Sequence, residues 1–182
     1  ETNDLGYLRE ADQILSGAAA GYNQWEPKGI YRSYNINGDA FIMNNFGGNI
    51  IGKVFEWNAS MELKNYWNVW TGGNLQSSSL SAGMLRGGPM MKLPGSTYAR
   101  IGFSTDYRKK LTFDVYLNGS KGWENYSGNL NTGVDLSYKP TNYISFTVSP
   151  AFSKSFSELQ YVTNLTYNNS DRYLFASIDR KT

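Results

Sequence analysis

Four carboxylates in strand-like segments are the residues of this chain whose chemistry could serve catalysis. Glycoside hydrolases use two carboxyl groups about 5–9.5 Å apart, one as an acid and one as a base or nucleophile. Glu56 and Glu62 are six residues apart, which separates them by about 20 Å in an extended strand. We therefore interpret the carboxylates as polar residues of a solvated surface, balanced by cations such as Arg100 and Lys64. The four carboxylates are Glu56, Glu62, Asp114 and Asp135.

The residue types that are missing narrow the chemistry further. The chain has 182 residues and contains no His and no Cys. This removes the commonest general base and metal ligand, together with thiolate nucleophiles and disulfides. A net charge of +2 with scattered basic residues does not indicate nucleic-acid binding. We expect no cofactor, no metal site, no enzymatic activity of this segment and no nucleic-acid partner.

Three kinds of short motif allow two interpretations each. The glycine pair at 87–88 could present backbone N–H groups to an anion, but a tight loop is the simpler interpretation. The run Tyr107–Lys110 could bind a lipid phosphate, but we favour the simpler interpretation of a charged turn at a membrane rim. Two aromatic pairs could stack on sugar rings, and we favour anchoring at a membrane interface instead. These pairs are Tyr22 with Trp25, and Trp123 with Tyr126.

The elements that carry these residues show a period of two. Apolar and polar residues alternate from Ile51 to Leu63, with Lys53 the exception on the apolar side, and a strand satisfies this period whereas a helix does not. We expect residues 1–12 to form a lead-in arm and residues 13–182 to form one all-β domain of about ten strands in up-and-down order. The Asn37-Gly38 step could split the strand predicted for 30–44 into a hairpin. The segment 78–96 lacks clear alternation, and we interpret it as a loop rather than a spanning strand.

Three features favour a membrane barrel over a soluble sandwich. Several alternating runs reach ten to fourteen residues, whereas soluble strands average about five or six and tilted membrane strands need about nine to eleven. Many aromatic residues lie beside turns, as interfacial girdles require. Short turns at 64–65, 107–110, 139–142 and 168–171 alternate with longer loops at 78–96, 121–125 and 154–158, which is typical of a barrel with two different rims. The predicted fold is an antiparallel up-and-down transmembrane β-barrel.

The alternation assigns each strand residue to one of two surfaces. The predicted lipid-facing residues are Phe55, Trp57, Met61, Phe113, Val115, Leu130, Val134, Leu136, Phe146 and Val148. The predicted lumen-facing residues are Glu56, Glu62, Arg100, Asp114 and Asp135. The predicted aromatic girdle consists of Trp25, Tyr66, Trp67, Tyr138 and Tyr143.

Several sequence blocks carry a family resemblance. They are 3–8, Gln24-Trp25, 46–49, 85–89 followed by 93–95, and 160–162. In this order they resemble a bacterial family of unknown function, whose members are outer-membrane β-barrel proteins with an N-terminal carbohydrate-binding module of the family-nine type. The resemblance implies that this chain is the barrel portion, that the sugar-binding module precedes it, and that further strands complete a larger barrel. Some members carry the label membrane-associated hydrolase, but the family supplies no catalytic motif.

Together these observations lead to one expectation and two alternatives. We expect a barrel domain of the bacterial outer membrane that serves as an anchor or solute conduit, tied to a glycan-binding module. Its expected partners are membrane lipid, the outer-membrane assembly machinery, and a glycan or another outer-membrane protein. The first alternative is a soluble β-sandwich that binds carbohydrate through exposed aromatic residues. The second is a carboxylate-based hydrolase, which the spacing of Glu56 and Glu62 disfavours.

Overall fold

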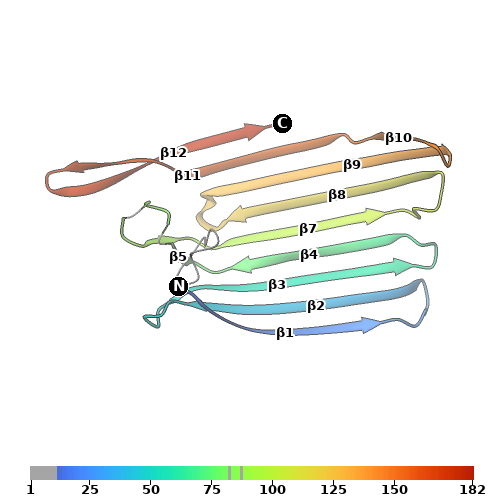
Figure 1. The fold of residues 1–182 in the computed structure, drawn as a ribbon, viewed down its shortest axis with the longest axis horizontal. Helices are drawn as coiled ribbons and strands as arrows, with labels where there is room; N and C mark the ends of the chain where they lie inside the picture. The colour runs from blue at the N-terminus through green and yellow to red at the C-terminus, as the bar shows by residue number, and fades with distance from the viewer. Residues whose placement is uncertain (1–11, 82, 87) are drawn as a thin grey trace.

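The chain folds into one antiparallel sheet of ten strands. The computed structural model describes residues 12–81, 83–86 and 88–182, and the predicted lead-in arm 1–12 lies outside this range except for Asp12. The strand order is β1-β2-β3-β4-β7-β8-β9-β11-β12, with β10 also paired to β9, so strands that follow one another in the sequence are neighbours in space (Figure 1). The predicted all-β, up-and-down order is confirmed. The sheet is open, with β1 and β12 at its two edges.

The strands are long, as the alternating runs predict. β2, β3, β9 and β11 have 14, 14, 15 and 17 residues. The bounds are β1 Ile14–Gln24, β2 Tyr31–Asn44, β3 Ile50–Leu63, β4 Asn68–Gln76, β7 Ser96–Ser104, β8 Leu111–Gly122, β9 Ser127–Thr141, β10 Ile144–Val148, β11 Ala151–Tyr167 and β12 Ser170–Lys181.

Two local predictions can be judged from these bounds. β2 passes through Asn37-Gly38 without a turn, because Gly38 pairs with Ala20 on one side and Trp57 on the other. The loop predicted at 154–158 is wrong, because β11 continues through it in register with β9. Four of these five residues are polar, but they do not interrupt the strand.

The segment between β4 and β7 is an excursion from the sheet. β4 pairs directly with β7. In the described part of the segment between them, the strands are the short β5 (Ser79–Ser81) and β6 (Met91–Leu93), which pair with each other. No spanning strand lies in the described part of 78–96, as the loop interpretation predicts. One 3₁₀ turn, Trp123–Asn125, joins β8 to β9, and the described residues include no helix that is long and apolar enough to cross a membrane.

The sheet therefore has two different ends. We call the end with the turns 25–30, 64–67, 105–110 and 142–143 the short-turn rim, and the end with the 77–95 excursion the excursion rim. The turn at 168–169, predicted to lie with the short turns, lies at the excursion rim because β11 is one unbroken strand. Asn168 and Asn169 have φ angles of 50° and 57° there, which suits a two-residue hairpin turn.

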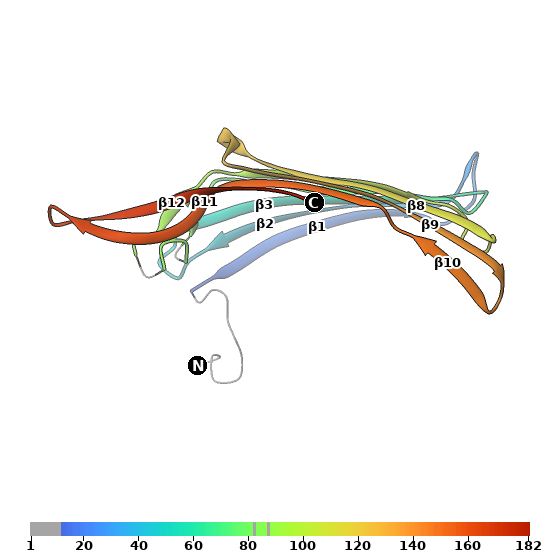
Figure 2. The ribbon, with the colours of Figure 1, turned by 90° about the horizontal axis from the view of Figure 1, so that it is seen from above.

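A single layer cannot have an ordinary core, and this sheet is one curved layer when it is seen from its edge (Figure 2). Within the described ranges the one buried hydrophobic residue is Leu85, which is 7% exposed and lies in the excursion. Aromatic rings instead lie directly over glycines on neighbouring strands. A Cβ at these glycines would overlap the ring, so a larger residue would not leave room for it. Such cross-strand pairs stabilise a sheet and fix its register. Examples are Phe41 with Gly17, Trp57 with Gly73, Trp70 with Gly102 and Tyr116 with Gly133.

Candidate functional site: two faces and the short-turn rim

The register separates an apolar face from a polar face. One continuous row of paired residues crosses five strands on the apolar face, and every member is apolar: Met61, Val69, Phe103, Val115 and Val134. All ten residues predicted to meet lipid lie on this face, and all five predicted to face a lumen lie on the opposite, polar face. The separation into faces agrees with the sequence, whereas contact with lipid stays a prediction.

The apolar face is exposed along its length. Ile101 in the middle of the sheet is 52% exposed, and Phe146 in β10 is 61% exposed. Further large side chains on this face, among them Phe55, Leu117 and Leu130, are also exposed. No second layer of the described residues covers them. A soluble monomer rarely exposes a contiguous apolar patch larger than a few hundred Å², so this face needs an apolar partner.

Lysines mark one boundary of the apolar face, and that boundary is oblique. Lys53, Lys121 and Lys154 lie on the apolar face toward the excursion rim, on β3, β8 and β11. When the paired residues are followed from strand to strand, Lys121 lies in the same row as Phe55 of β3. Lys154 lies in the same row as Trp57 of β3. The boundary therefore moves by four residues across five strand-to-strand steps. With about 3.3 Å per residue and about 4.8 Å between strands, it crosses the hydrogen-bonded rows at about 30°.

Aromatic residues mark the opposite boundary with the same slope. Tyr34 pairs with Met61 on β3. Trp67 on β4 lies opposite Leu63, so it is two residues closer to the short-turn rim than Tyr34. Tyr138 on β9 is the partner of Leu111, and its row lies another two residues closer to that rim. This boundary also moves by four residues over five steps. The two boundaries enclose a slanted apolar band about nine residues long on each strand, or roughly 26 Å between its edges after correction for the slant.

The polar face is covered by amide and hydroxyl groups that bond to one another across strands. Asn35 Nδ2 donates to Ser60 Oγ at 2.8 Å, and Asn37 Nδ2 donates to Asn58 Oδ1 at 3.0 Å. Near the other edge of the sheet, Ser153 Oγ donates to an Asn131 oxygen at 2.6 Å. These pairs satisfy part of the hydrogen-bonding capacity of the face and leave it strongly hydrophilic.

The register also creates two carboxylate pairs that the sequence did not indicate. Asp114 pairs with Asp135 across β8 and β9, and Glu56 pairs with Asp39 across β2 and β3. Like charges directly opposite one another weaken a sheet, and neither pair has an ion-pair partner among the described residues. No group of three potential metal ligands occurs in the described ranges. Among the described residues, no ion pair distinguishes one member of either pair as an acid and the other as a base.

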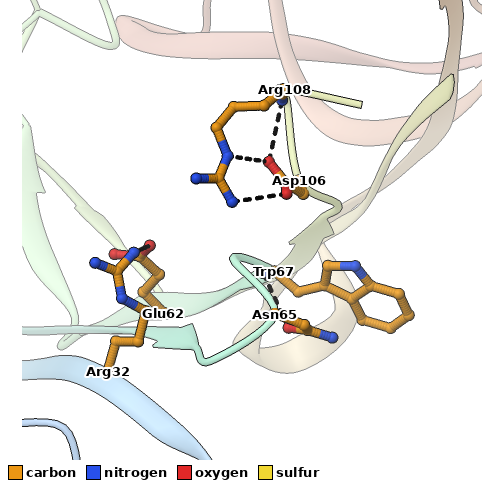
Figure 3. Close-up of polar contacts among 6 residues, drawn as sticks. All are labelled: Arg32, Glu62, Asn65, Trp67, Asp106 and Arg108. Atoms are coloured by element: carbon orange, nitrogen blue, oxygen red, sulfur yellow. Dashed lines mark hydrogen bonds and ion pairs between the residues drawn. The ribbon is translucent and has the colours of Figure 1, made fainter. Parts of the chain in front are cut away.

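The predicted lumen-facing cations are arranged differently from the expectation. Glu62 pairs with Arg32, whose Nη1 lies 2.7 Å from Glu62 Oε1 (Figure 3), and not with Arg100 or Lys64. Arg100 instead lies over the indole of Trp70, with its Cζ 5.6 Å from the ring centroid. Arg32 was not singled out from the sequence, because its role depends on the bulged pairing between Tyr31 and Ser33 that the register alone reveals.

The β7–β8 turn at the short-turn rim is organised by Asp106. Its carboxylate accepts hydrogen bonds from the backbone N–H, Nε and Nη2 of Arg108, at 3.0, 2.8 and 2.9 Å. The dashed lines in Figure 3 show this clasp. The side-chain hydrogen bonds from Arg108 lower the pKa of Asp106 from 3.8 to about 2, although its burial acts in the opposite direction. The same hydrogen bonds raise the pKa of Arg108.

The predicted girdle residues occupy two different environments. Trp67 packs edge-to-face on Phe103 on the apolar face, with the ring centroids 5.0 Å apart. The backbone N–H of Trp67 donates a hydrogen bond to Asn65 Oδ1 at 3.1 Å. Trp25, Tyr138 and Tyr143 are exposed at the short-turn rim or at the edge of the apolar band. Tyr66 departs from this pattern, because guanidinium groups lie over its ring: Cζ of Arg108 at 3.3 Å and Cζ of Arg32 at 4.1 Å.

The aromatic pair at the excursion rim is held against the backbone. Trp123 Nε1 donates to Thr97 Oγ1 at 3.1 Å, and its ring covers Gly95. The Tyr126 hydroxyl donates to the carbonyl of Pro94 at 3.2 Å, while its ring covers Gly122. Each ring is fixed by a hydrogen bond and a glycine contact. The glycine contact covers one side of each ring, and Trp123 is still 46% exposed.

One comparison with known proteins gave a match. The model of a family described as "Domain of unknown function (DUF5916)" matches residues 1–182. The chain belongs to the DUF5916 family. The comparisons with curated proteins and with solved structures found no match. Family membership therefore fixes the relationship of the chain and leaves its role to the geometry described above.

Proposed function

We propose that this sheet is part of the wall of an outer-membrane β-barrel, with its apolar face toward lipid and its polar face toward the lumen. The slanted apolar band carries the proposal. Outer-membrane barrels have an apolar band about 25 Å tall, crossed by strands tilted about 35–45° and flanked by aromatic residues. The band described here is roughly 26 Å between boundaries that cross the rows at about 30°. Lysines flank one side and aromatic residues the other.

A soluble carbohydrate-binding sandwich is the alternative, and the packing gives it less support. A sandwich needs two sheets packed about 10 Å apart, with their apolar side chains interdigitated. All ten strands of the large sheet lie in one layer and leave the apolar face uncovered by the described residues. The rings of Trp123 and Tyr126, which could have stacked on sugars, are held against glycines on one side. A lipid surface covers the apolar face without a second sheet.

The proposed role within the membrane is that of an anchor or a solute conduit, linked to a glycan-binding module. In the open sheet, β1 and β12 each pair on one side only within the described ranges. Unpaired backbone groups in a bilayer cost several kcal/mol each, so the proposal requires further strands, or a partner, that pair with these edges. It also implies insertion by the outer-membrane assembly machinery. The amide and hydroxyl groups of the polar face suit a water-filled lumen.

Dependence on detergent tests the proposal. The chain, expressed with any strands needed to pair with β1 and β12, should stay in solution as a defined species only with detergent or lipid. It should also migrate differently on an electrophoresis gel before and after boiling, because folded barrels resist unfolding by the detergent in the gel. A monodisperse protein in buffer without detergent, with the same sheet content by circular dichroism, would contradict the proposal and favour the sandwich.

A further inference from the structure

An open cavity of about 250 Å³ lies on the apolar face, where β8, β9 and β11 are neighbours (Figure 1). Gly128 and Leu130 of β9 line its middle, and the ring of Phe156 from β11 lies over Gly128. Lys121 of β8 and Lys154 of β11 line its two sides. The cavity therefore combines an apolar floor with one lysine on each flank.

The register places these five residues on one surface. Lys121 pairs with Gly128, and Gly128 pairs with Phe156 on its other side. Lys154 pairs with Leu130, which is one of the residues predicted to meet lipid. Residues directly opposite each other in a sheet project from the same face. The two lysines and the apolar residues between them thus share the apolar face.

A third lysine adds positive charge to this place. Lys181 of β12 is the direct partner of Lys154, and its Nζ lies 5.8 Å from the centroid of the Phe152 ring. Like charges directly opposite one another weaken a sheet. Neither of these lysines, nor Lys121, belongs to an ion pair of the described chain. An anion between them would offset the repulsion.

The neighbouring carboxylates lie outside the cavity. Glu124, Glu158 and Asp179 are all further toward the excursion rim than the lysines, and none of them lines the cavity. Asp179 shares the apolar face as the partner of Phe156, two residues from Lys181. These negative charges disfavour an anion on the rim side of the lysines. The side toward the apolar band remains favourable for one.

Two of the lysines are close enough to meet on one anion. Lys121 and Lys154 are two strands and two residues apart, which separates their Cα atoms by about 12 Å. A lysine carries its charge at the end of a flexible four-carbon stem, so the two ammonium groups can converge over the floor between them. Phosphate oxygens accept strong, charge-assisted hydrogen bonds from such groups.

We propose that this cavity binds the phosphate group of an anionic membrane lipid, whose acyl chains lie on the apolar band. The inference rests on the proposed contact of the apolar face with lipid. The phosphate meets Lys121 and Lys154, while Leu117 and Val134, exposed further along β8 and β9, are available to the chains. A free phosphate ion would use the lysines and leave Leu130 uncovered, so the site suits a lipid better.

The test compares two lysines of the same boundary. Lys154→Gln removes one charge from the cavity, and Lys154→Arg keeps that charge. Lys53→Gln is the matched control, because Lys53 lies on the same face but pairs with Ile42 and is four strand-to-strand steps from β9. That distance is about 19 Å, beyond the screening length of about 8 Å at physiological salt. Each protein, with any strands needed to pair with β1 and β12, is folded into phosphatidylcholine vesicles that contain a small fraction of spin-labelled phosphatidylglycerol, and the immobilised fraction of the label is measured.

Lys154→Gln should lower the affinity for phosphatidylglycerol about tenfold, through the loss of one charge-assisted contact. Lys121→Gln should cause a similar loss, Lys53→Gln should change the affinity less than about twofold, and Lys154→Arg should retain binding. Equal losses in Lys154→Gln and Lys53→Gln would mean that each lysine attracts lipid separately and would overturn the shared site. Displacement of the labelled lipid by an equal concentration of inorganic phosphate would show that the acyl chains contribute nothing, and would overturn the lipid source.

A stability measurement separates loss of binding from loss of the fold. Because Lys154→Gln also removes the repulsion from Lys181, it should unfold in pure phosphatidylcholine vesicles at the same urea concentration as the native chain, or at a higher one. A lower urea midpoint there would assign the lysine a structural role and contradict the proposal. A native chain that does not enter vesicles would contradict both the proposed function and the lipid site. A chain that enters vesicles but does not prefer phosphatidylglycerol to phosphatidylcholine would contradict the lipid site alone.

Discussion

Arginine substitutions on the apolar face test the slant of the apolar band. Met61 and Val134 belong to the same hydrogen-bonded row, but the slant places them at different depths. Val134 lies four residues from the aromatic boundary at Tyr138 and about five from the lysine boundary. Met61 is the partner of Tyr34, at the aromatic boundary itself. Val134 should therefore lie near the centre of the bilayer and Met61 near its surface.

The magnitudes follow from these depths. Arginine on a lipid face costs about 2–4 kcal/mol at the midplane and about 0–1 kcal/mol near the interfaces. Val134→Arg should therefore lower the free energy of unfolding by about 2–4 kcal/mol, and Met61→Arg by about 1 kcal/mol or less. Leu130→Arg, on the strand of Val134 but next to the lysine boundary, should also have a small effect. Asp135→Arg points to the polar face, opposite Asp114, and should leave stability nearly unchanged.

Urea unfolding in phosphatidylcholine vesicles, followed by tryptophan fluorescence, measures these differences. They are large against a total stability of about 5–15 kcal/mol. Equal losses for Met61→Arg and Val134→Arg would refute the slant, because residues of one row would then share one depth. Val134→Leu separates lipid from a protein core: it should be neutral against fluid acyl chains, whereas overpacking a core typically costs about 1–3 kcal/mol. A clear loss in Val134→Leu would refute the membrane assignment of this face.

Three further outcomes are expected. Gly102→Ala should lower the urea midpoint, because the new Cβ overlaps the Trp70 indole and overpacking costs about 1–3 kcal/mol. Gly119→Ala is the matched control, because a Cβ there makes only ordinary contacts. Equal effects of the two substitutions would contradict the role of the Trp70–Gly102 contact. Asp106→Asn should destabilise the protein at neutral pH, because the lowered pKa of about 2 gives stability that is present above pH 4 and lost as the pH falls toward 2. A difference in urea midpoint that stays constant down to pH 2 would contradict that assignment. The chain should not hydrolyse chromogenic glycosides, and a rate that disappears in folded Asp114→Asn would show otherwise.

The sequence predicts the two faces of the sheet well and the cross-strand neighbours poorly. Alternation is local, so it assigns Glu56 or Val134 to a face without knowledge of any other strand. Pairing depends on turn lengths and bulges, so the contact between Asp114 and Asp135 follows only from the register. The bulges between Ser157 and Gln160 and between Tyr161 and Thr163 in β11 also interrupt the period. This explains why the sequence predicted a loop beside them at 154–158.

The short-turn rim shows a second limit of sequence reasoning. The position of Tyr66 beside a turn predicts an interfacial anchor, yet its ring lies under the guanidinium groups of Arg32 and Arg108. These two arginines come from β2 and from the β7–β8 turn, more than thirty residues away on either side. No local pattern links such distant segments. Asp106 was overlooked for a related reason, since a turn aspartate bound by its own neighbour gives no signal beyond ordinary turn composition.

The most direct test of membrane contact uses tryptophans on opposite faces. Trp57 lies on the apolar face, and Trp70 lies on the polar face. Two single-tryptophan variants, with the other tryptophans replaced by phenylalanine, are folded into vesicles of phosphatidylcholine brominated on its acyl chains. Bromine quenches only the fluorescence of rings that it can approach closely. If the apolar face meets lipid, Trp57 should be strongly quenched and Trp70 only slightly. Equal quenching of the two, or an unquenched Trp57 in a folded protein, would contradict membrane contact of this face.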